Sequence, residues 1–120
     1  METMGNPFSI IIDKDHLSPT VRIQGEVDIH TCPELNQQLN ILISEGHKTL
    51  ILNLEKVHYI DSTGLGIIAH AARNIQSDNG KLVLISSKPQ IKKLIDMSGL
   101  KDKNISLFET ESSALESLVS

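Results

Sequence analysis

The segment from residue 49 to residue 76 constrains the fold more than any other part of the chain. It opens with an apolar run over residues 49–54, which predicts a buried strand. A polar turn follows, and the chain then continues in a helical pattern to about Gln76. Strands that alternate with helices in this way predict a largely parallel sheet. The apolar or small residues at helical spacing are Leu65, Ile68, Ala69, Ala72 and Ile75.

The turn between this strand and helix holds a carboxylate, two hydroxyls and two glycines over residues 61–66. Asp61, Ser62 and Thr63 are all good helix N-caps, because their oxygens accept hydrogen bonds from unpaired backbone N–H groups. Each glycine, however, costs about 1 kcal/mol relative to alanine inside a helix. A local rule broken twice in one turn indicates that something approaches the backbone closely here. We therefore look for function at this turn.

The rest of the chain repeats the strand and helix patterns around this unit. Two strands joined by a short polar segment should pair as an antiparallel hairpin. Capping-box patterns at residues 31–34 and 87–90 predict the starts of two helices. The order ββαβαβαβα predicts one α/β domain over residues 1–120, with a mixed, mainly parallel sheet and flanking helices, and with residues 1–7 as a flexible tail. The predicted strands are 8–13, 20–24, 49–54, 81–86 and 105–108, and the predicted helices are 31–46, 61–76, 87–99 and 114–119.

Composition narrows the class of protein. The net charge is −4 with both signs interspersed, which argues against a nucleic-acid or anionic-membrane surface. No apolar run approaches the roughly 20 residues that span a bilayer, and residues 1–7 lack the pattern of a signal peptide. The single cysteine, Cys32, fits a reducing compartment. We expect a cytoplasmic protein.

Metal binding and hydrolysis find little support in the sequence. The five histidines show no i,i+4 pair and no cysteine partner at ligand spacing, so we expect no metal. Ser62 lies in a strand-to-helix turn, but the Gly-x-Ser-x-Gly pattern of a nucleophile elbow is missing. His70, two turns along the helix, is too distant to act as its base. We expect no catalytic residue and no enzyme activity.

Two other functions could use the same turn. Gly64 and Gly66 open a helix after a strand, as in a dinucleotide fingerprint with Ala69 as the variant third position, but such a match alone is weak. A phospho-receiver domain also has an Asp after a central strand. Here two strands precede the first helix, and Glu109 follows the last strand where a receiver has a lysine. We set the receiver aside and expect no cofactor, while a nucleotide-binding protein stays open as an alternative.

Phosphorylation of Ser62 would turn this site into a switch. A phosphate adds about −1.5 to −2 charges, and the helix dipole at an N-terminus offsets part of that charge. A partner docked over the two glycines would meet a bulky dianion beside Asp61. Binding could then be switched without refolding. The alternative is that Asp61 and Ser62 are ordinary helix caps.

Residues 60–67, Ile-Asp-Ser-Thr-Gly-Leu-Gly-Ile, closely resemble the signature of STAS domains, particularly those of bacterial anti-sigma factor antagonists. The run Gly25-Glu26-Val27-Asp28, followed by residues 31–35, is similar to a second segment of that family. The order of elements and the length also fit, so the resemblance covers essentially the whole chain.

The resemblance implies a partner-switching regulator of transcription. The unphosphorylated protein would bind an anti-sigma factor of the histidine-kinase-like ATPase type and thereby release a sigma factor. That kinase would phosphorylate Ser62 and separate the pair, and a PPM-type serine phosphatase would restore the binding form. Thr63 is a less favoured second acceptor. The partner-binding residues implied by position are Asp28, Asp61, Ser62, Thr63, Gly64, Leu65 and Gly66.

The same resemblance leaves other outputs open. STAS domains also serve as scaffolds or subunits in stressosome-like, chemotaxis-linked and lipid-transport complexes. One alternative is therefore a scaffold subunit whose Ser62 is never phosphorylated. We expect a monomer or a weak dimer with no nucleic-acid or membrane partner.

Overall fold

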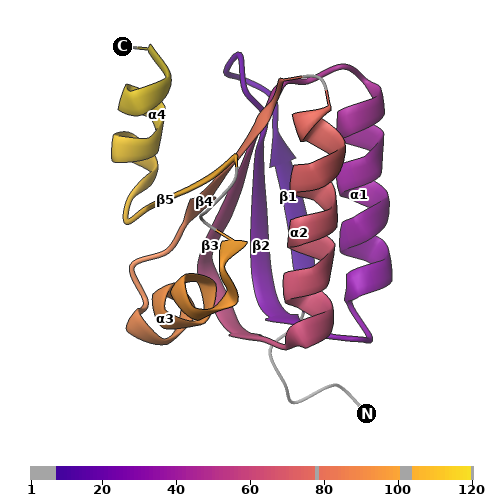
Figure 1. The fold of residues 1–120 in the computed structure, drawn as a ribbon, viewed down its shortest axis with the longest axis vertical. Coiled ribbons are helices and arrows are strands. Elements are labelled where there is room, and N and C mark those ends of the chain that lie inside the picture. The colour runs from indigo at the N-terminus through magenta and orange to yellow at the C-terminus, as the bar shows by residue number, and fades with distance from the viewer. Residues whose placement is uncertain (1–7, 78, 101–103, 120) are drawn as a thin grey trace.

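A five-stranded sheet with the order β1-β2-β3-β4-β5 organises the molecule, and the hairpin β1–β2 is antiparallel while every other pair is parallel (Figure 1). The computed structural model describes residues 8–77, 79–100 and 104–119. The predicted tail, residues 1–7, lies outside them. The predicted fold class and order of elements are confirmed. The strands are β1 (Ser9–Asp13), β2 (Thr20–Val27), β3 (Thr49–Ile60), β4 (Lys81–Ile85) and β5 (Ile105–Phe108), and the helices are α1 (Cys32–Ser44), α2 (Ser62–Gln76), α3 (Pro89–Ser98) and α4 (Glu111–Val119).

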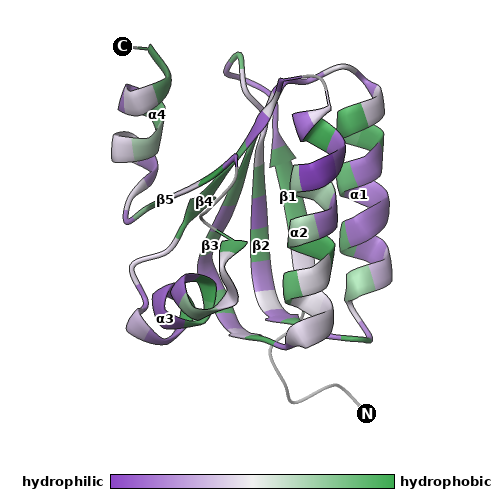
Figure 2. Ribbon diagram, viewed as in Figure 1, coloured by the Kyte–Doolittle hydropathy of each residue, from purple (hydrophilic) through white to green (hydrophobic). Residues whose placement is uncertain are grey.

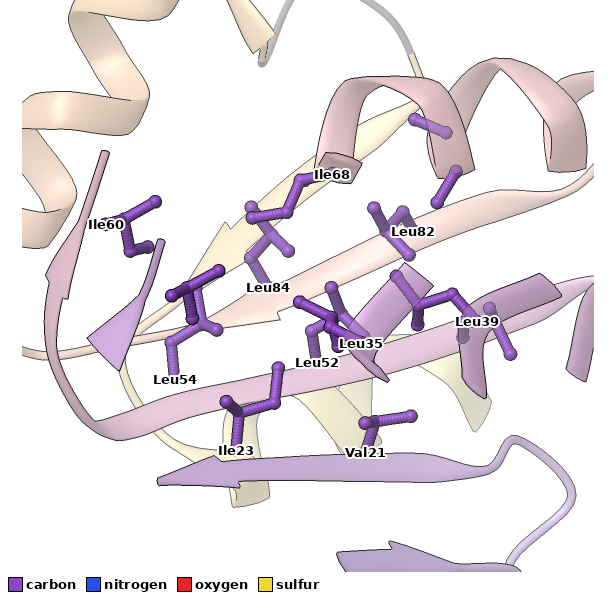
Figure 3. Close-up of a cluster of buried hydrophobic side chains, with 14 of the residues drawn as sticks. Val21, Ile23, Leu35, Leu39, Leu52, Leu54, Ile60, Ile68, Leu82 and Leu84 are labelled. Atoms are coloured by element: carbon purple, nitrogen blue, oxygen red, sulfur yellow. The ribbon is translucent and has the colours of Figure 1, made fainter. Parts of the chain in front are cut away.

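Helices α1, α2 and α3 cover one face of the sheet, and α4 covers part of the other. Side chains alternate between the two faces of a strand, so Leu82 and Leu84 of β4 enter the larger core while Val83 and Ile85 face α4. Figure 3 shows the larger core, where aliphatic side chains from the strands meet α1 and α2. β4 is buried on both faces from Leu82 to Ile85.

The helical patterns also place the expected residues inside. Figure 2 shows hydrophobic and hydrophilic residues alternating along α1 and α2 as the helices turn. In α2, Ile68, Ala72 and Ile75 are buried as predicted, whereas Leu65 and Ala69 are half-buried. α3 ends before Gly99, which adopts a left-handed φ of 77° that glycine tolerates.

β3 runs further than its sequence pattern predicted. The apolar run ends at Leu54, but the strand continues to Ile60 because β2 pairs with it along the additional length. The pairing is irregular between Arg22 and Gln24 and between Gly25 and Glu26. β2 likewise extends to Val27, through residues that the sequence placed in a connection. Because of this longer pairing, β2 and β3 end side by side, at Val27 and Ile60.

Both predicted capping boxes are wrong. Thr31 is the N-cap of α1 but makes no side-chain capping bond. The second helix begins one residue later than its box requires, with Lys88 as the N-cap, and Ser87 donates its hydroxyl to Glu55 instead. In each case the hydroxyl bonds to a group outside the helix, Glu26 for Thr31 and Glu55 for Ser87. No helix in the described part of the chain is long and apolar enough to cross a membrane.

Candidate functional site

The site lies where β2 and β3 end side by side. Val27 pairs with Ile60 in the parallel register, and the backbone N–H of Asp61 donates to the Val27 carbonyl at 3.1 Å. Neighbouring strands lie about 4.8 Å apart, so the residues that follow each strand emerge together. Asp28 and Asp61, which are 33 positions apart in the chain, therefore share one edge of the sheet.

Asp61 forms the N-cap of α2, as its residue type predicted. Its backbone is extended, and its carboxylate accepts a hydrogen bond from the Gly64 N–H at 2.9 Å. Its carbonyl accepts from Leu65 N–H at 3.0 Å, which closes the first helical turn. Asp61 thus holds the start of α2 in place through one carboxylate oxygen, and its side chain is half-buried.

Ser62 is the first residue of α2, and Ser62 and Thr63 are both exposed. Within the residues that the structure describes, the Ser62 side chain makes no hydrogen bond or ion pair. The hydroxyl therefore projects from a helix N-terminus without a structural task. The positive end of the helix dipole lies beneath it, where negative charge is tolerated.

The two glycines of the turn have opposite surroundings. A Cβ on Gly64 would lie 2.8 Å from side-chain carbons of Val27 and Ile60 and 2.9 Å from the Val27 carbonyl oxygen. A Cβ on Gly66 would have nothing within 4 Å. The close approach at Gly64 therefore comes from the protein's own strands, and only Gly66 leaves open surface. We expected both glycines to let an outside partner approach the backbone, but only Gly66 has room for one.

Asp28 organises the loop that enters α1. Its carboxylate Oδ1 accepts from the N–H groups of His30 at 2.9 Å and Thr31 at 3.1 Å. The Thr31 hydroxyl in turn accepts from the Asp28 N–H at 2.9 Å and donates to the Glu26 carbonyl at 2.7 Å. Asp28 thus accepts from the Thr31 N–H, the group that the predicted capping box assigned to Glu34, while Thr31 makes no side-chain bond to the helix.

Both acidic residues influence the pKa of one buried thiol, Cys32. Burial raises the pKa of Cys32, and the negative charges of Asp61 and then Asp28 raise it further. Both carboxylates thus act on the same buried sulfur at the start of α1. The structure brings together Asp28 and residues 61–66, the whole predicted set, although Gly64 is buried and Leu65 is half-buried against the larger core.

Exposed apolar side chains beside this site were not predicted. Ile29 is 64% exposed and Tyr59 is 51% exposed. Tyr59 also lines a groove of about 330 Å³ between the end of β3 and α3, where Met97 is 74% exposed. Figure 1 shows the start of α2 and α3 at the same end of the sheet. Sequence offers no signal for these residues, because exposure depends on which neighbours cover a side chain. The groove residues are His58, Tyr59, Gln90, Ile91, Lys93, Leu94 and Met97.

The site consists of hydroxyl groups, carboxylates and exposed helix backbone. In the described part of the chain, no group of three or more His, Cys, Asp or Glu residues is placed to hold a metal ion.

Comparisons with known proteins agree with this architecture. The STAS domain family matches residues 10–114. The anti-sigma-B factor antagonist of Staphylococcus aureus (strain NCTC 8325 / PS 47) is 34% identical over 82 residues, which cover 68% of this chain and 76% of the relative.

Two solved structures show the same fold at lower identity. An anti-sigma factor antagonist from Mycobacterium paratuberculosis matches with a TM-score of 0.86 and 22% identity, covering 95% of this chain and 96% of that one. The Bacillus cell fate determinant SpoIIAA in its phosphorylated form matches with a TM-score of 0.74 and 23% identity, covering 92% and 99%. With its strand–helix junction, its order of elements and these relatives, the chain belongs to the STAS domain family and groups with the anti-sigma factor antagonists.

Proposed function

We propose that this protein is a phosphorylation-controlled anti-sigma factor antagonist. Its unphosphorylated form binds an anti-sigma factor of the histidine-kinase-like ATPase type, which releases a sigma factor. The docking surface consists of Asp28 and residues 61–66, extended by the exposed apolar side chains of Ile29 and Tyr59. The relatives named as anti-sigma-B factor antagonists support the class of partner.

The observation that carries this proposal is the exposed Ser62 hydroxyl at the first residue of α2. A kinase can reach this oxygen without unfolding the protein, and the γ-phosphoryl group of ATP would pass to Ser62 Oγ with release of ADP and the hydroxyl proton. The open surface at Gly66, one turn along the helix, lets a partner backbone come close. Acceptor and docking surface therefore coincide.

Phosphate at Ser62 acts on the partner more than on the domain. The new charge of about −1.5 to −2 lies at the positive end of α2, which stabilises it by roughly 0.3–1 kcal/mol. A docked partner would have to desolvate that dianion next to the Asp61 carboxylate. The phosphate on Ser62 should therefore leave the fold stable and weaken binding of the partner.

The protein itself is a binding module in this mechanism and performs no chemistry. The anti-sigma factor supplies the kinase activity, and a PPM-type serine phosphatase removes the phosphate. The exchange takes place in the cytoplasm, where ATP and the sigma factor are present.

Substitution of Ser62 tests the switch. Ser62→Ala should keep binding the anti-sigma factor from the same organism, and kinase activity should no longer release it. Ser62→Asp should weaken binding by roughly tenfold or more, which corresponds to about 1.4 kcal/mol. Isothermal titration calorimetry of the purified pair measures both. Ser112→Asp is the matched control, because Ser112 is also an exposed serine in the first turn of a helix, α4, and this variant should bind normally.

Intact mass spectrometry tests the modification itself. Incubation with the anti-sigma factor and ATP should add one phosphate to the wild type and none to Ser62→Ala, and a PPM-type phosphatase should remove it. Equal affinities of wild type, Ser62→Asp and Ser112→Asp, or a phosphate found elsewhere, would refute the switch and favour a constitutive scaffold.

A further inference from the structure

The outer edge of β1 is an unpaired strand edge with an apolar composition. β1 is the first strand in the sheet order, and no other strand of the described residues pairs with its outer side. Its sequence is Ser-Ile-Ile-Ile-Asp, and Ile11 is 61% exposed. An edge strand presents a row of backbone N–H and C=O groups that can accept a further strand.

This edge lacks most of the devices that block such pairing. Lysine, proline, a bulge or a covering element normally protects an edge, but β1 contains no lysine or proline and pairs regularly with β2. Phe8, Ile10 and Ile12 pack against the larger core yet are only half-buried. The opposite edge, β5, differs on the other face of the sheet, where Phe108 packs against the small cluster with α4 while Ile11 of β1 stays exposed. The β1 edge is therefore the more open of the two.

The strand is also complementary to itself. When two copies of β1 run antiparallel about a two-fold axis at Ile11, Ile11 faces Ile11, and Ile10 faces Ile12. Asp13 then lies opposite Ser9, and Lys14 lies opposite Phe8, so no like charges meet. Apolar and β-branched cross-strand pairs stabilise a sheet, and like charges directly opposite destabilise it. The register centred on Asp13 would place two carboxylates face to face, which disfavours it.

We infer that the β1 edge is a homodimer interface, in which two copies pair antiparallel through β1 with Ile11 on the two-fold axis and join their sheets into one. Such an interface is isologous, because the same residues serve on both sides. The parallel strands of the two copies then run in opposite directions, so the two Ser62 sites point away from each other. Dimerisation leaves both docking surfaces free and does not depend on the phosphorylation state.

Analytical ultracentrifugation over a range of protein concentrations tests this interface. The mass of the wild type should rise with concentration from 13.2 kDa toward twice that value. Ile11→Lys and Ile11→Glu should each stay monomeric, because each places two like charges opposite one another at the axis. An equimolar mixture of the two variants should dimerise again, since lysine then faces glutamate. Leu17→Lys is the control for lost exposed apolar surface, because Leu17 is fully exposed in the β1–β2 turn, and it should dimerise as the wild type does.

Hydrogen exchange of the wild type gives a readout that needs no substitution. Amide protection in β1 should increase with protein concentration, while protection in the β1–β2 turn should not change. A wild type that stays monomeric at every concentration, a mixture that does not dimerise, or loss of the dimer in Leu17→Lys would overturn the proposal. Ser62→Asp should dimerise normally, so a failure here leaves the proposed switch untouched, and the converse also holds.

Discussion

Gly64 and Gly66 stand in the same turn of α2 and serve different purposes. Gly64 has no room for a Cβ, because Val27 and Ile60 approach it to 2.8 Å. It lets the start of α2 rest directly on the ends of β2 and β3, and so fixes where Ser62 projects. Gly66 faces open space. Gly64 therefore positions the site by close packing, and Gly66 leaves the helix backbone accessible at its surface.

Alanine at these two positions should separate folding from binding. Gly64→Ala should lower the free energy of unfolding by about 1–3 kcal/mol, because the added methyl group overpacks the contact with the strands. Gly66→Ala should leave stability unchanged or raise it by up to about 1 kcal/mol, since alanine is the better helix former. Urea unfolding followed by circular dichroism measures both.

The same pair also reports on the proposed docking surface. Gly66→Ala should weaken binding of the anti-sigma factor although the fold is intact, because the methyl group stands where the partner backbone approaches. Gly66→Ala with wild-type affinity would show that the partner does not approach this turn. A Gly64→Ala protein as stable as the wild type would show that the strand contacts yield more easily than the 2.8 Å approach indicates.

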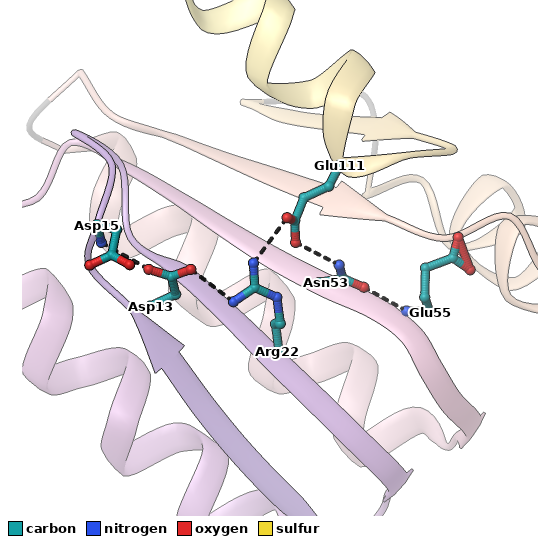
Figure 4. A network of polar contacts seen from close by, with 6 residues as sticks. All are labelled: Asp13, Asp15, Arg22, Asn53, Glu55 and Glu111. Atoms are coloured by element: carbon teal, nitrogen blue, oxygen red, sulfur yellow. Dashed lines mark hydrogen bonds and ion pairs between the residues drawn. The ribbon is translucent and has the colours of Figure 1, made fainter.

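At the scale of elements, α4 is anchored to the sheet by a polar network (Figure 4). Arg22 of β2 donates to Glu111 at 2.9 Å and to Asp13 at 3.0 Å, and Asn53 of β3 donates to the other Glu111 oxygen at 2.9 Å. Glu111 is the first residue of α4. One carboxylate thus ties the start of the helix to two strands, on the face where few apolar residues hold it.

This network makes stability depend on pH in the acid range. Burial by itself raises the pKa of Glu111, but the hydrogen bonds from Arg22 and Asn53 outweigh burial and leave that pKa below its ordinary value. The backbone N–H of Asp15 and the Arg22 guanidinium likewise lower the pKa of Asp13. A carboxyl whose pKa is lowered on folding stabilises the protein above its unfolded pKa, about 4.3 for Glu. That stabilisation declines as the pH falls through the folded pKa.

Glu111→Gln should therefore change the acid limb of the stability profile. At pH 7 the variant should unfold more easily by up to about 1 kcal/mol, the scale of a half-exposed ion pair. Well below the pKa of Glu111 the wild type carries a neutral carboxyl, so the two proteins should converge. Chemical unfolding between neutral and acid pH measures the difference.

Glu116→Gln is the matched control, because Glu116 is exposed on the same helix. It should follow the wild-type profile at every pH. A constant difference between Glu111→Gln and the wild type across the whole range would mean that the charge of Glu111 does not anchor α4.

At the scale of the whole molecule, the two faces of the sheet are unequally covered. Three helices and the larger core lie on one face, while α4 meets a small cluster of Ile51, Val83, Ile85 and Ala114 on the other. In the part of α4 that the structure describes, Ala114 is the buried residue, whereas α2 buries residues along its whole length. Local opening follows local burial, so α4 should open without the rest of the fold.

Amide hydrogen exchange tests this difference. The α4 amides should exchange roughly tenfold or more faster than those of α2, because fewer apolar contacts must break to expose them. α1 is the internal reference, since it buries Cys32, Leu35, Leu39 and Leu42 and should exchange with α2. Exchange of α4 at the same rate as α2 would show that the Glu111 network and its small core make α4 part of the global unfolding unit.

The periodicity of side chains was enough to predict the elements and their order, because the spacing of apolar residues along a strand or helix is a local property. It identified Leu52, Ile68 and Leu84 as strand and helix positions of the interior. The residue types of the turn predicted Asp61 as the cap of α2. The family resemblance then drew attention to Ser62, and the structure leaves that residue exposed at the helix start.

Only the tertiary structure decided which of these residues contact each other and which stay exposed. β3 extends to Ile60 because β2 supplies backbone partners, and Asp28 displaces the Thr31 capping box because the loop brings its carboxylate to two N–H groups. Gly64 and Gly66 are the same residue type in one turn, yet Val27 and Ile60 of the strands contact Gly64 while a Cβ on Gly66 would have no neighbour within 4 Å. Local sequence determined the parts of this protein and its candidate switch residue. The register between strands, a property of residues far apart, decided the surface around that residue.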